Sequence, residues 1–302
     1  AQIGPDAPEE HKLKVMEQLV AKLQALREYD RFDPRQMESV IPRRNYREVE
    51  RIEVGIGVAA LRVFHDGRIF SGYYDGTVRV FTKLGHGDWR SEVLDGHTGT
   101  VRSLQVLLDG RMISGSFDTT IRIWSKGAHG NWSSEALEGH KGEVSCLQAL
   151  PDGRIVSGSC DRTIQIWTEG GESQWKSEVL EGHQGAVLCL QALPDGRIVS
   201  GSEDKSMRIW TKAVDGTWTA EVLRGHEGCI WCLQAIPDGR IISGSSDGTI
   251  RIWSKGSDSE WSSEVISESV GTVSFLRTLP DGRIVSGARG STVQIQNLKI
   301  WT

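Results

Sequence analysis

One text recurs along this chain at a fixed interval, and the interval limits the possible folds more than any other feature. The stretch LPDGRIVSGSCDRTIQIW (150–167) returns almost unchanged as LPDGRIVSGSEDKSMRIW (193–210). Each copy contains Asp-Gly-Arg, which begins every 43 residues, at Asp66, Asp109, Asp152, Asp195, Asp238 and Asp281. A tryptophan keeps the same step, at Trp89, Trp132, Trp175, Trp218 and Trp261. Six such units fill residues 45–302 without an insertion, so we predict one repeat domain, preceded by an extension over residues 1–44.

Each unit has the pattern of four short antiparallel strands. In the unit that contains Trp210, we predict strands at 186–193, 197–202, 207–211 and 217–225, because alternating and β-branched residues are separated by turn residues. Pro194, Asp195 and Gly196 suit the first turn, since the glycine takes the positive φ that other residues resist. The repeat domain is therefore predicted to be all-β.

A single four-stranded sheet cannot bury both of its faces, so each unit needs neighbours. Radial packing of like sheets supplies them, and we predict a six-bladed β-propeller with four antiparallel strands per blade. A solenoid is the alternative, but it needs atypical units at its ends. The array begins with a fourth-strand segment, residues 46–54, and ends after a third strand, so we expect these residues to pair with the last blade and close the ring. A chain that continues beyond Thr302 would allow a seventh blade.

Composition narrows the classes of partner. The chain has 35 basic and 40 acidic residues and a net charge of −5, which disfavours binding to a nucleic-acid backbone. It has no signal peptide and no apolar run of the roughly 18 residues that a membrane helix needs, so we expect a cytoplasmic protein that does not bind membranes.

The cysteines do not have the spacing of a metal site. Cys146, Cys189 and Cys232 share one position of the repeat and fit small buried side chains. Cys229 and Cys232 form a CxxC, but strand residues three apart point to opposite faces, and no second pair completes a zinc site. We predict no metal and no cofactor.

The repeated text includes Gly-His before the first strand, Ser-Gly-Ser in the second, Asp in the next turn and Trp closing the third. In these residues, residues 45–302 resemble the WD-repeat family. The resemblance implies that His, Ser, Asp and Trp form a buried hydrogen-bonded network in each blade. The matching sets are His97, Ser114, Asp118 and Trp124; His140, Ser157, Asp161 and Trp167; His183, Ser200, Asp204 and Trp210; His226, Ser243, Asp247 and Trp253.

The first and last units depart from this pattern. The first has Val54 and Phe81 at the His and Trp positions, and the last has Ser269, Gly290 and Gln296 at the His, Asp and Trp positions. The Trp is always followed by Ser or Thr, so the dipeptide that names the family is absent. Four copies of one His-Ser-Asp arrangement indicate a structural network rather than a hydrolase, because a nucleophile needs exposure and an oxyanion site. We predict a protein without catalytic residues.

Positions at which the copies disagree are candidates for function. By resemblance, these positions surround the central opening, where family members hold peptide or protein partners. Aromatic, Arg and carboxylate side chains around a concavity are typical of binding hot spots. We predict that a protein or peptide binds there, in a scaffold or adaptor role. The predicted partner-binding residues are Tyr74, Arg102, Phe117, Glu143, Cys160, Leu188, Glu203, Trp231, Ser246 and Arg289.

Two other functions are alternatives to this one. The loops that end in tryptophan, such as GHGNW and DGTW, would suit a multivalent lectin, because polar groups beside an indole favour sugar stacking. The competing interpretation is that each Trp packs over the outer strand. A sialidase-like Ser-x-Asp occurs at residues 245–247, but the Gly and Trp that should follow it are missing.

The extension contains a predicted amphipathic helix at about residues 6–30. Asp6 and Glu9 form a capping box, and Pro8 suits the first turn. The helix would pack on the side of the ring, pair with a second copy or bind a partner helix. Its apolar stripe consists of Met16, Leu19, Val20, Leu23 and Leu26.

Overall fold

The computed structural model describes residues 57–64, 66–85, 88–171, 174–236, 238–256, 258, 260–268, 271–278, 283–288 and 294–297. All elements within these ranges are strands, and no helix in them is long and apolar enough to cross a bilayer. The strands form six antiparallel sheets, which we number 1 to 6 in chain order. Strands that follow each other in the chain are also neighbours in each sheet. The described part of the chain is therefore all-β, as predicted.

Sheet 1 consists of β1 (Val58–Val63), β2 (Ile69–Tyr73), β3 (Val78–Lys83) and β4 (Trp89–Leu94). Sheet 2 consists of β5 (Val101–Val106), β6 (Met112–Ser116), β7 (Ile121–Lys126) and β8 (Trp132–Leu137). Sheet 3 consists of β9 (Val144–Ala149), β10 (Ile155–Ser159), β11 (Ile164–Glu169) and β12 (Trp175–Leu180).

Sheet 4 consists of β13 (Val187–Ala192), β14 (Ile198–Ser202), β15 (Ser206–Lys212) and β16 (Trp218–Arg224). Sheet 5 consists of β17 (Ile230–Ala235), β18 (Ile241–Ser245), β19 (Thr249–Lys255) and β20 (Trp261–Glu268). Sheet 6 comprises β21 (Val273–Thr278), β22 (Arg283–Ala288) and β23 (Gln294–Asn297) within the described ranges.

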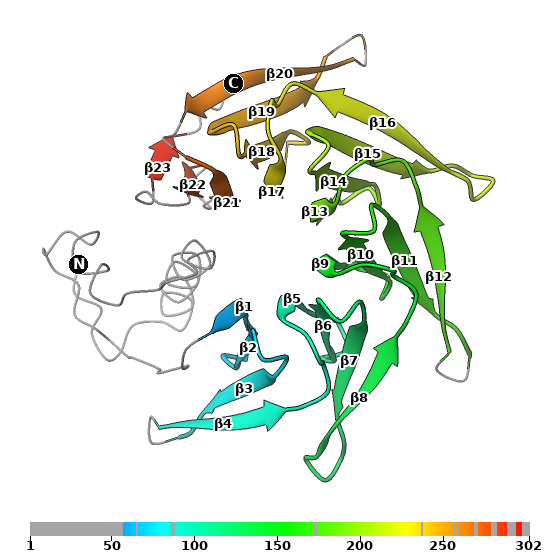
Figure 1. The fold of residues 1–302 in the computed structure, drawn as a ribbon, viewed down its shortest axis with the longest axis vertical. Coiled ribbons are helices and arrows are strands. Elements are labelled where there is room, and N and C mark those ends of the chain that lie inside the picture. The colour runs from blue at the N-terminus through cyan, green and yellow to red at the C-terminus, as the bar shows by residue number, and fades with distance from the viewer. Residues whose placement is uncertain are drawn as a thin grey trace, which may run out of the picture.

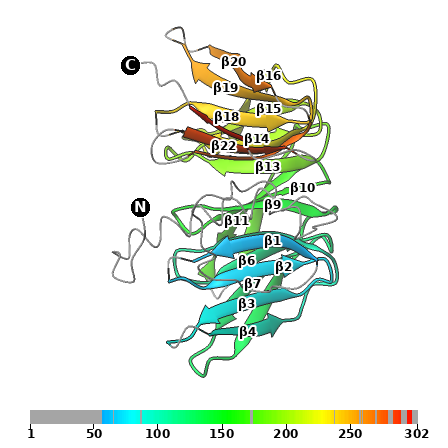
Figure 2. The same ribbon diagram turned by 90° about the vertical axis from the view of Figure 1, so that its left-hand side faces the viewer.

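The sheets are arranged radially. Figure 1 shows the first strand of each sheet (β1, β5, β9, β13, β17 and β21) near a common axis, with the later strands further out. Consecutive inner strands contact each other from β1 through to β21. Sheets 1 and 6 stand at the two ends of this array (Figure 1), and Figure 2 shows the same stack from the side. This is the propeller-like arrangement that the repeat predicts.

The core lies between consecutive sheets. One apolar cluster joins Ile113 and Ile123 of sheet 2 to Val144, Leu147 and Trp167 of sheet 3, and all five side chains are buried. Equivalent clusters fill the other junctions. Each inner sheet therefore buries apolar side chains on both faces, which is why one unit cannot be stable alone.

The central glycine of Ser-Gly-Ser permits this close packing. A Cβ built on Gly115 of β6 would lie 2.7 Å from Val144 Cγ1 of the next sheet, and one on Gly158 would lie 2.6 Å from Val187 Cγ1. These distances are shorter than any ordinary contact between carbon atoms. The repeated glycine is therefore required by the approach of the neighbouring inner strand.

The two turns of a unit differ in which residue types adopt a positive φ. At the Asp-Gly-Arg turn, Gly196 has a φ of 85°, as predicted from its sequence. At the turn after the second strand, three non-glycine residues have positive φ values of 67° to 73°: Thr119, Arg162 and Lys205. Gly76 and Gly248 occupy the same position in sheets 1 and 5. A non-glycine residue is strained there, so side chains are kept at some energetic cost.

Several predictions from the sequence fall on residues outside the described ranges. They are the helix at residues 6–30, the closing strand at residues 46–54 and the position of Arg289. A closed ring of six blades also stays a prediction, because its closure depends on residues 46–54.

Candidate functional site

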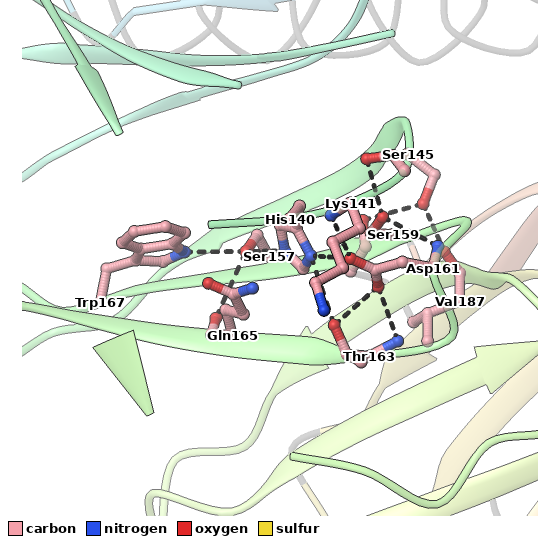
Figure 3. A network of polar contacts seen from close by, with 12 residues as sticks. His140, Lys141, Ser145, Ser157, Ser159, Asp161, Thr163, Gln165, Trp167 and Val187 are labelled. Carbon is pink, nitrogen blue, oxygen red and sulfur yellow. Dashed lines mark hydrogen bonds and ion pairs between the residues drawn. The ribbon is translucent and has the colours of Figure 1, made fainter. Parts of the chain in front are cut away.

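The site begins with the hydrogen-bonded network of each central sheet, which Figure 3 shows for sheet 3. Trp167 Nε1 donates to Ser157 Oγ at 2.9 Å, and Ser157 Oγ lies 2.7 Å from His140 Nε2. His140 Nδ1 lies 2.8 Å from Asp161 Oδ2. The Asp161 carboxylate can only accept, so the His140 Nδ1–H donates to it. The Nε2 of the neutral imidazole then accepts from the Ser157 hydroxyl, whose oxygen accepts from the indole N–H. The chain of donors runs from the core to the turn.

The structure brings the other three predicted sets together in the same geometry. Their Trp–Ser distances are 2.7 to 2.8 Å, their Ser–His distances are 2.7 Å and their His–Asp distances are 2.8 to 2.9 Å. These sets are His97, Ser114, Asp118 and Trp124; His183, Ser200, Asp204 and Trp210; His226, Ser243, Asp247 and Trp253.

Burial and hydrogen bonding fix the charges of the network. Burial lowers the pKa of His140, and the adjacent Asp161 offsets only part of that shift, so the imidazole is neutral near pH 7. For Asp161, burial acts to raise the pKa, but hydrogen bonds from Thr163 and the Lys141 amide lower it to about 2. The carboxylate is therefore ionised, as its role of acceptor requires.

Asp161 also ties the turn to the loop before the first strand. It accepts hydrogen bonds from the Lys141 amide at 2.9 Å and from Thr163 Oγ1 at 2.6 Å. Ser159 adds a second tie, because its Oγ donates to the Gly142 carbonyl and accepts from the Asp161 amide, both at 3.0 Å. The buried network thus holds the backbone on either side of Cys160.

The network serines are out of reach of a substrate. Ser114, Ser157, Ser200 and Ser243 are all 0% exposed. A nucleophile must contact the atom that it attacks, so this geometry suits a structural role. Among the described residues, no group of three or more His, Cys, Asp or Glu side chains could hold a metal ion.

The variable positions next to the turn share one backbone geometry. The amide of Cys160 donates to the Glu143 carbonyl at 2.9 Å, and the amide of Phe117 donates to the Thr100 carbonyl at 2.9 Å. The same bond joins Tyr74 to Gly57, Glu203 to Ala186 and Ser246 to Cys229, at 2.9 to 3.0 Å. Two variable positions, one on the turn and one on the loop before the inner strand, are therefore held side by side in five sheets.

The side chains at the turn position point out of the fold. Tyr74 is 44% exposed and Phe117 is 40% exposed, which is unusual for aromatic residues, and Cys160, Glu203 and Ser246 are also exposed. Glu143, on the paired loop, has its Oε2 3.9 Å from Cys160 Sγ. This edge of the array therefore displays aromatic, thiol, carboxylate and hydroxyl groups in succession.

The predicted residues of the inner strands lie deeper. Arg102, Leu188 and Trp231 are partly buried, and Trp231 Nε1 is buried without a hydrogen-bond partner. In the same position, the Ser145 hydroxyl contacts the Val187 carbonyl of the next sheet, and Ala59 is fully buried. At this position of the repeat, some side chains therefore pack in the core and others are partly exposed. Arg289 is outside the described residues.

Reasoning from the sequence missed one set of residues at this edge. Thr119, Arg162 and Lys205 follow the network aspartates and take positive φ, and the last two are exposed. In sheets 1 and 5 the same position is a glycine, Gly76 or Gly248, and this glycine is the signal that could have identified them. A position that alternates between Gly and other residues next to a turn indicates left-handed backbone.

Sheet 1 replaces the missing network with a different contact. Tyr73 stands where the other sheets have the second serine of Ser-Gly-Ser, and it is buried. Ser71 Oγ, in the position of the network serine, donates to the Tyr73 hydroxyl at 3.2 Å. The Arg79 guanidinium lies over the Tyr73 ring, 4.6 Å from its centroid. A phenol thus partners the serine that an imidazole partners elsewhere.

The recurrent tryptophan of the outer strands joins consecutive sheets. Trp132 Nε1 donates to Glu92 Oε2 of the preceding sheet at 2.9 Å, and Lys126 Nζ donates to the same atom at 2.9 Å. Trp218 makes the equivalent bond to Glu178 at 3.0 Å. Trp132 and Trp218 also pack against the apolar clusters of their junctions. These contacts fit the packing interpretation of the Trp-ended loops.

The cysteines of the inner strands are free thiols. Cys189 is buried, whereas Cys146 and Cys232 are partly buried, which differs from the expectation that all three are buried. Each thiol contacts a carbonyl of the next inner strand, as Cys189 Sγ does with Ile230 O at 3.4 Å. Burial raises the pKa of Cys146 to about 12, so this thiol stays protonated.

Comparison with known protein families identifies the family of the chain. The family described as WD domain, G-beta repeat matches at residues 90–125, 132–168, 175–211 and 218–254. The chain belongs to the WD-repeat family. Repeats of this family generally mediate protein–protein interactions, and proteins that contain them are typically non-catalytic scaffolds. Comparison with curated proteins gives no match.

Proposed function

We propose that this protein is a non-catalytic interaction scaffold that binds a protein or peptide segment at the turn edge of the array. We define the turn edge by the paired positions Tyr74, Phe117, Cys160, Glu203 and Ser246 with the adjacent residues Arg102, Glu143, Leu188 and Trp231. Arg289 is assigned to the same edge by its place in the repeat.

One observation carries the proposal. In five sheets the same amide-to-carbonyl bond fixes the backbone of the turn position, while its side chain changes from Tyr to Phe, Cys, Glu and Ser. The fold therefore does not require any of these side chains. Two exposed aromatic rings at neighbouring sheets are costly in water unless a partner covers them.

Different side chains have different roles in such a complex. Tyr74, Phe117 and the partly exposed Trp231 supply large, rigid apolar surface. Glu143 and Glu203 provide the negative charge that the segment must match. Burial raises the pKa of the Cys160 thiol, and the charges of these two carboxylates raise it further. A segment with apolar anchors and a basic residue fits this edge.

The test uses a random peptide display library panned against the purified chain. Phe117→Ala and Trp231→Ala should weaken binding of the selected peptides by about thirtyfold each, which corresponds to about 2 kcal/mol for a hot-spot residue. Leu108→Ala is the matched control, because Leu108 is 82% exposed on the Asp-Gly-Arg turn at the opposite end of the inner strands.

Two outcomes would contradict the proposal. Peptides that bind Phe117→Ala and Trp231→Ala as tightly as the unchanged chain would move the site away from the turn edge. A glycan array that shows carbohydrate binding, lost on substitution of Trp132 or Trp218, would favour the lectin alternative instead. The free state of all five cysteines supports the proposal that the scaffold works in the cytoplasm. Pairing of two copies through residues 6–30 remains a second, separate proposal.

A further inference from the structure

A groove of about 450 Å³ lies between sheets 2 and 3, at the end of the array opposite the turn edge. The Asp-Gly-Arg turns of the two sheets and the end of β11 form its walls. Two of its lining residues, Leu108 and Glu169, differ from the residues that the neighbouring units have at the same positions. Both departures from the repeat therefore occur in one groove, which shares no residue with the turn edge.

The first departure exposes an apolar side chain. Sheets 3, 4 and 5 have a proline before Asp-Gly-Arg, at Pro151, Pro194 and Pro237, whereas sheet 2 has Leu108. Proline suits this turn because it presets the backbone, so the fold does not require a leucine here. Leu108 is 82% exposed, while the adjacent Leu107 is buried. The exposed leucine is therefore apolar surface that a partner can remove from water.

The second departure reverses a charge. Sheets 1, 2, 4 and 5 have a lysine at the end of the third strand: Lys83, Lys126, Lys212 and Lys255. Lys126 Nζ donates to Glu92 Oε2 of the preceding sheet at 2.9 Å, and the lysines of sheets 4 and 5 make the equivalent contact. Sheet 3 has Glu169 instead, and sheet 2 has Glu135 at the position of Glu92. Among the residues that the structure describes, the Glu135 carboxylate has no hydrogen bond and no ion pair.

Arg111 fixes the position of Glu169 on the groove wall. Its Nη1 and Nη2 donate to the two carboxylate oxygens of Glu169 at 3.0 and 2.5 Å, and its Nε donates to Asp109 Oδ2 at 2.7 Å. The guanidinium also lies over the Trp175 ring, 5.9 Å from its centroid. One cation thus serves two carboxylates. The Glu169 side chain is still 34% exposed, so its carboxylate can accept from a second cation.

The charged side chains that line the groove have an excess of negative charge. They are three carboxylates and two guanidinium groups: Asp109, Asp152, Glu169, Arg111 and Arg154. The equivalent positions between sheets 3 and 4 have two carboxylates and three cations: Asp152, Asp195, Arg154, Arg197 and Lys212. Glutamate in place of lysine therefore reverses the sign of the local charge between these two junctions, and a basic side chain from outside is attracted to the groove.

We propose that this groove is a second docking surface, which binds a protein segment that has a lysine or arginine next to an apolar side chain. The basic side chain takes the place of the lysine that the neighbouring junctions supply themselves, and it pairs with Glu169 and Glu135. The apolar side chain covers Leu108 and Pro151. The partner thus completes a contact that sheets 2, 4 and 5 make within the chain.

The experiment is panning of a random peptide display library on the full chain, with counter-selection on the Glu169→Lys chain. This variant should fold, because sheets 1, 2, 4 and 5 have the same lysine beside an Asp-Gly-Arg turn. Peptides that bind the turn edge bind both chains and are removed, so the result does not depend on the proposed function. We expect the remaining peptides to share a lysine or arginine next to an apolar residue.

Calorimetric titration of a selected peptide measures the contribution of each residue. Glu169→Lys should weaken binding by about tenfold or more, and Leu108→Pro, which installs the residue of sheets 3 to 5, should weaken it by about fivefold. Glu264→Lys is the matched control, because it makes the same change at an exposed residue of β20, and it should bind as the unchanged chain does. Phe117→Ala should also bind unchanged, which separates the groove from the turn edge.

Four results would overturn the proposal. The first is that no peptide survives the counter-selection, and the second is that the surviving peptides have no basic residue. The third is an equal loss of binding in Glu264→Lys. The fourth is self-association of the unchanged chain, seen by light scattering and lost in Glu169→Lys, which would assign the groove to a second copy of the chain. If Glu169→Lys does not fold, Glu169→Gln takes its place, since it removes the charge and keeps the shape of the side chain.

Discussion

Sheet 1 and sheet 3 have the same strands, the same order and nearly the same register, yet they satisfy their buried polar groups in different ways. Sheet 3 uses a chain of four side chains that runs from Trp167 to Asp161. Sheet 1 keeps the serine and the turn aspartate, Ser71 and Asp75, but has Tyr73 in place of the imidazole as the partner of the serine. The blade therefore does not depend on the network for its topology.

The two arrangements connect different parts of their sheets. In sheet 3 the network connects the core to the loop before the inner strand and to the turn that carries Cys160. In sheet 1 the Ser71–Tyr73 contact stays within β2, and within the described residues the hydrogen bonds to the Asp75 carboxylate come from Thr77. In sheets 2 to 5 the network thus adds side-chain ties to the turn edge, whereas the apolar clusters between sheets fix the fold.

The largest expected effect comes from removal of the shared serine. Ser157→Ala leaves Trp167 Nε1 and His140 Nε2 buried without partners, and we expect a loss of about 4 kcal/mol of unfolding free energy, at about 2 kcal/mol for each group. Ser71→Ala removes one hydrogen bond, the one to the Tyr73 hydroxyl, so its cost should be about 1 to 2 kcal/mol. Urea denaturation followed by tryptophan fluorescence measures both. Equal costs would show that the network is no more demanding than the tyrosine contact.

The second effect concerns the left-handed position of the turn. Gly76 has a φ of 86°, and a Cβ there would lie 2.5 Å from the His97 carbonyl oxygen of the next sheet. Gly76→Thr should therefore destabilise the chain by about 3 kcal/mol, from backbone strain together with overpacking. Thr119→Gly, the reverse change in sheet 2, should be neutral or stabilising by up to about 1 kcal/mol.

Thermal unfolding of the two variants decides this point. Destabilisation by Thr119→Gly would show that the Thr119 side chain is stabilising despite its positive φ, and an unchanged melting temperature of Gly76→Thr would show that the turn of sheet 1 has room for a side chain. Peptide binding by Thr119→Gly is the companion measurement, since a stabilised chain that binds less would show that the strained side chain is kept for the partner.

The smallest effect is the response to acid. The pKa values of His97, His140, His183 and His226 are lowered by burial, so these groups stay neutral in the folded chain while the unfolded chain takes up protons below about pH 6.5. Stability should therefore fall as the pH drops from 7 to 5. A second loss should follow from about pH 4 towards pH 2, where the lowered pKa values of Asp118 and Asp161 lie.

Melting temperatures measured across this range test the prediction, with an expected fall of a few degrees between pH 7 and pH 5. NMR of the imidazole protons assigns the effect to the central sheets, because sheets 2 to 5 hold all four network histidines. A melting temperature that is constant from pH 7 to pH 5 would show that the histidines have no lowered pKa.

The sequence predicts most of the described fold because its period and its turn residues agree. The strands expected at 186–193 and 207–211 are found as β13 (Val187–Ala192) and β15 (Ser206–Lys212), and Gly196 has the positive φ expected of it. The interval of 43 residues also places Ser157, Asp161 and Trp167 in register before any contact is known. Local propensity and the repeat point to one answer.

The remaining features depend on contacts between units, which a repeat does not reveal. The hydrogen bond from Trp132 Nε1 to Glu92 forms only because sheet 2 packs beside sheet 1. Gln234 and Arg277 are far apart in the chain and form a hydrogen bond only because β17 and β21 are neighbouring inner strands. The exposure of Phe117 and the partial burial of Trp231 likewise follow from packing depth rather than from residue type.

The bond from the Cys160 amide to the Glu143 carbonyl, and its counterparts in the other sheets, use main-chain atoms only. Such a bond does not depend on which side chain is present at either position. Mutation can therefore rewrite the chemistry displayed by one unit without refolding that unit or disturbing its neighbours, and duplication of a unit adds one more independently adjustable position. A lineage that carries this array can acquire new partners by small steps, each of which leaves the scaffold intact.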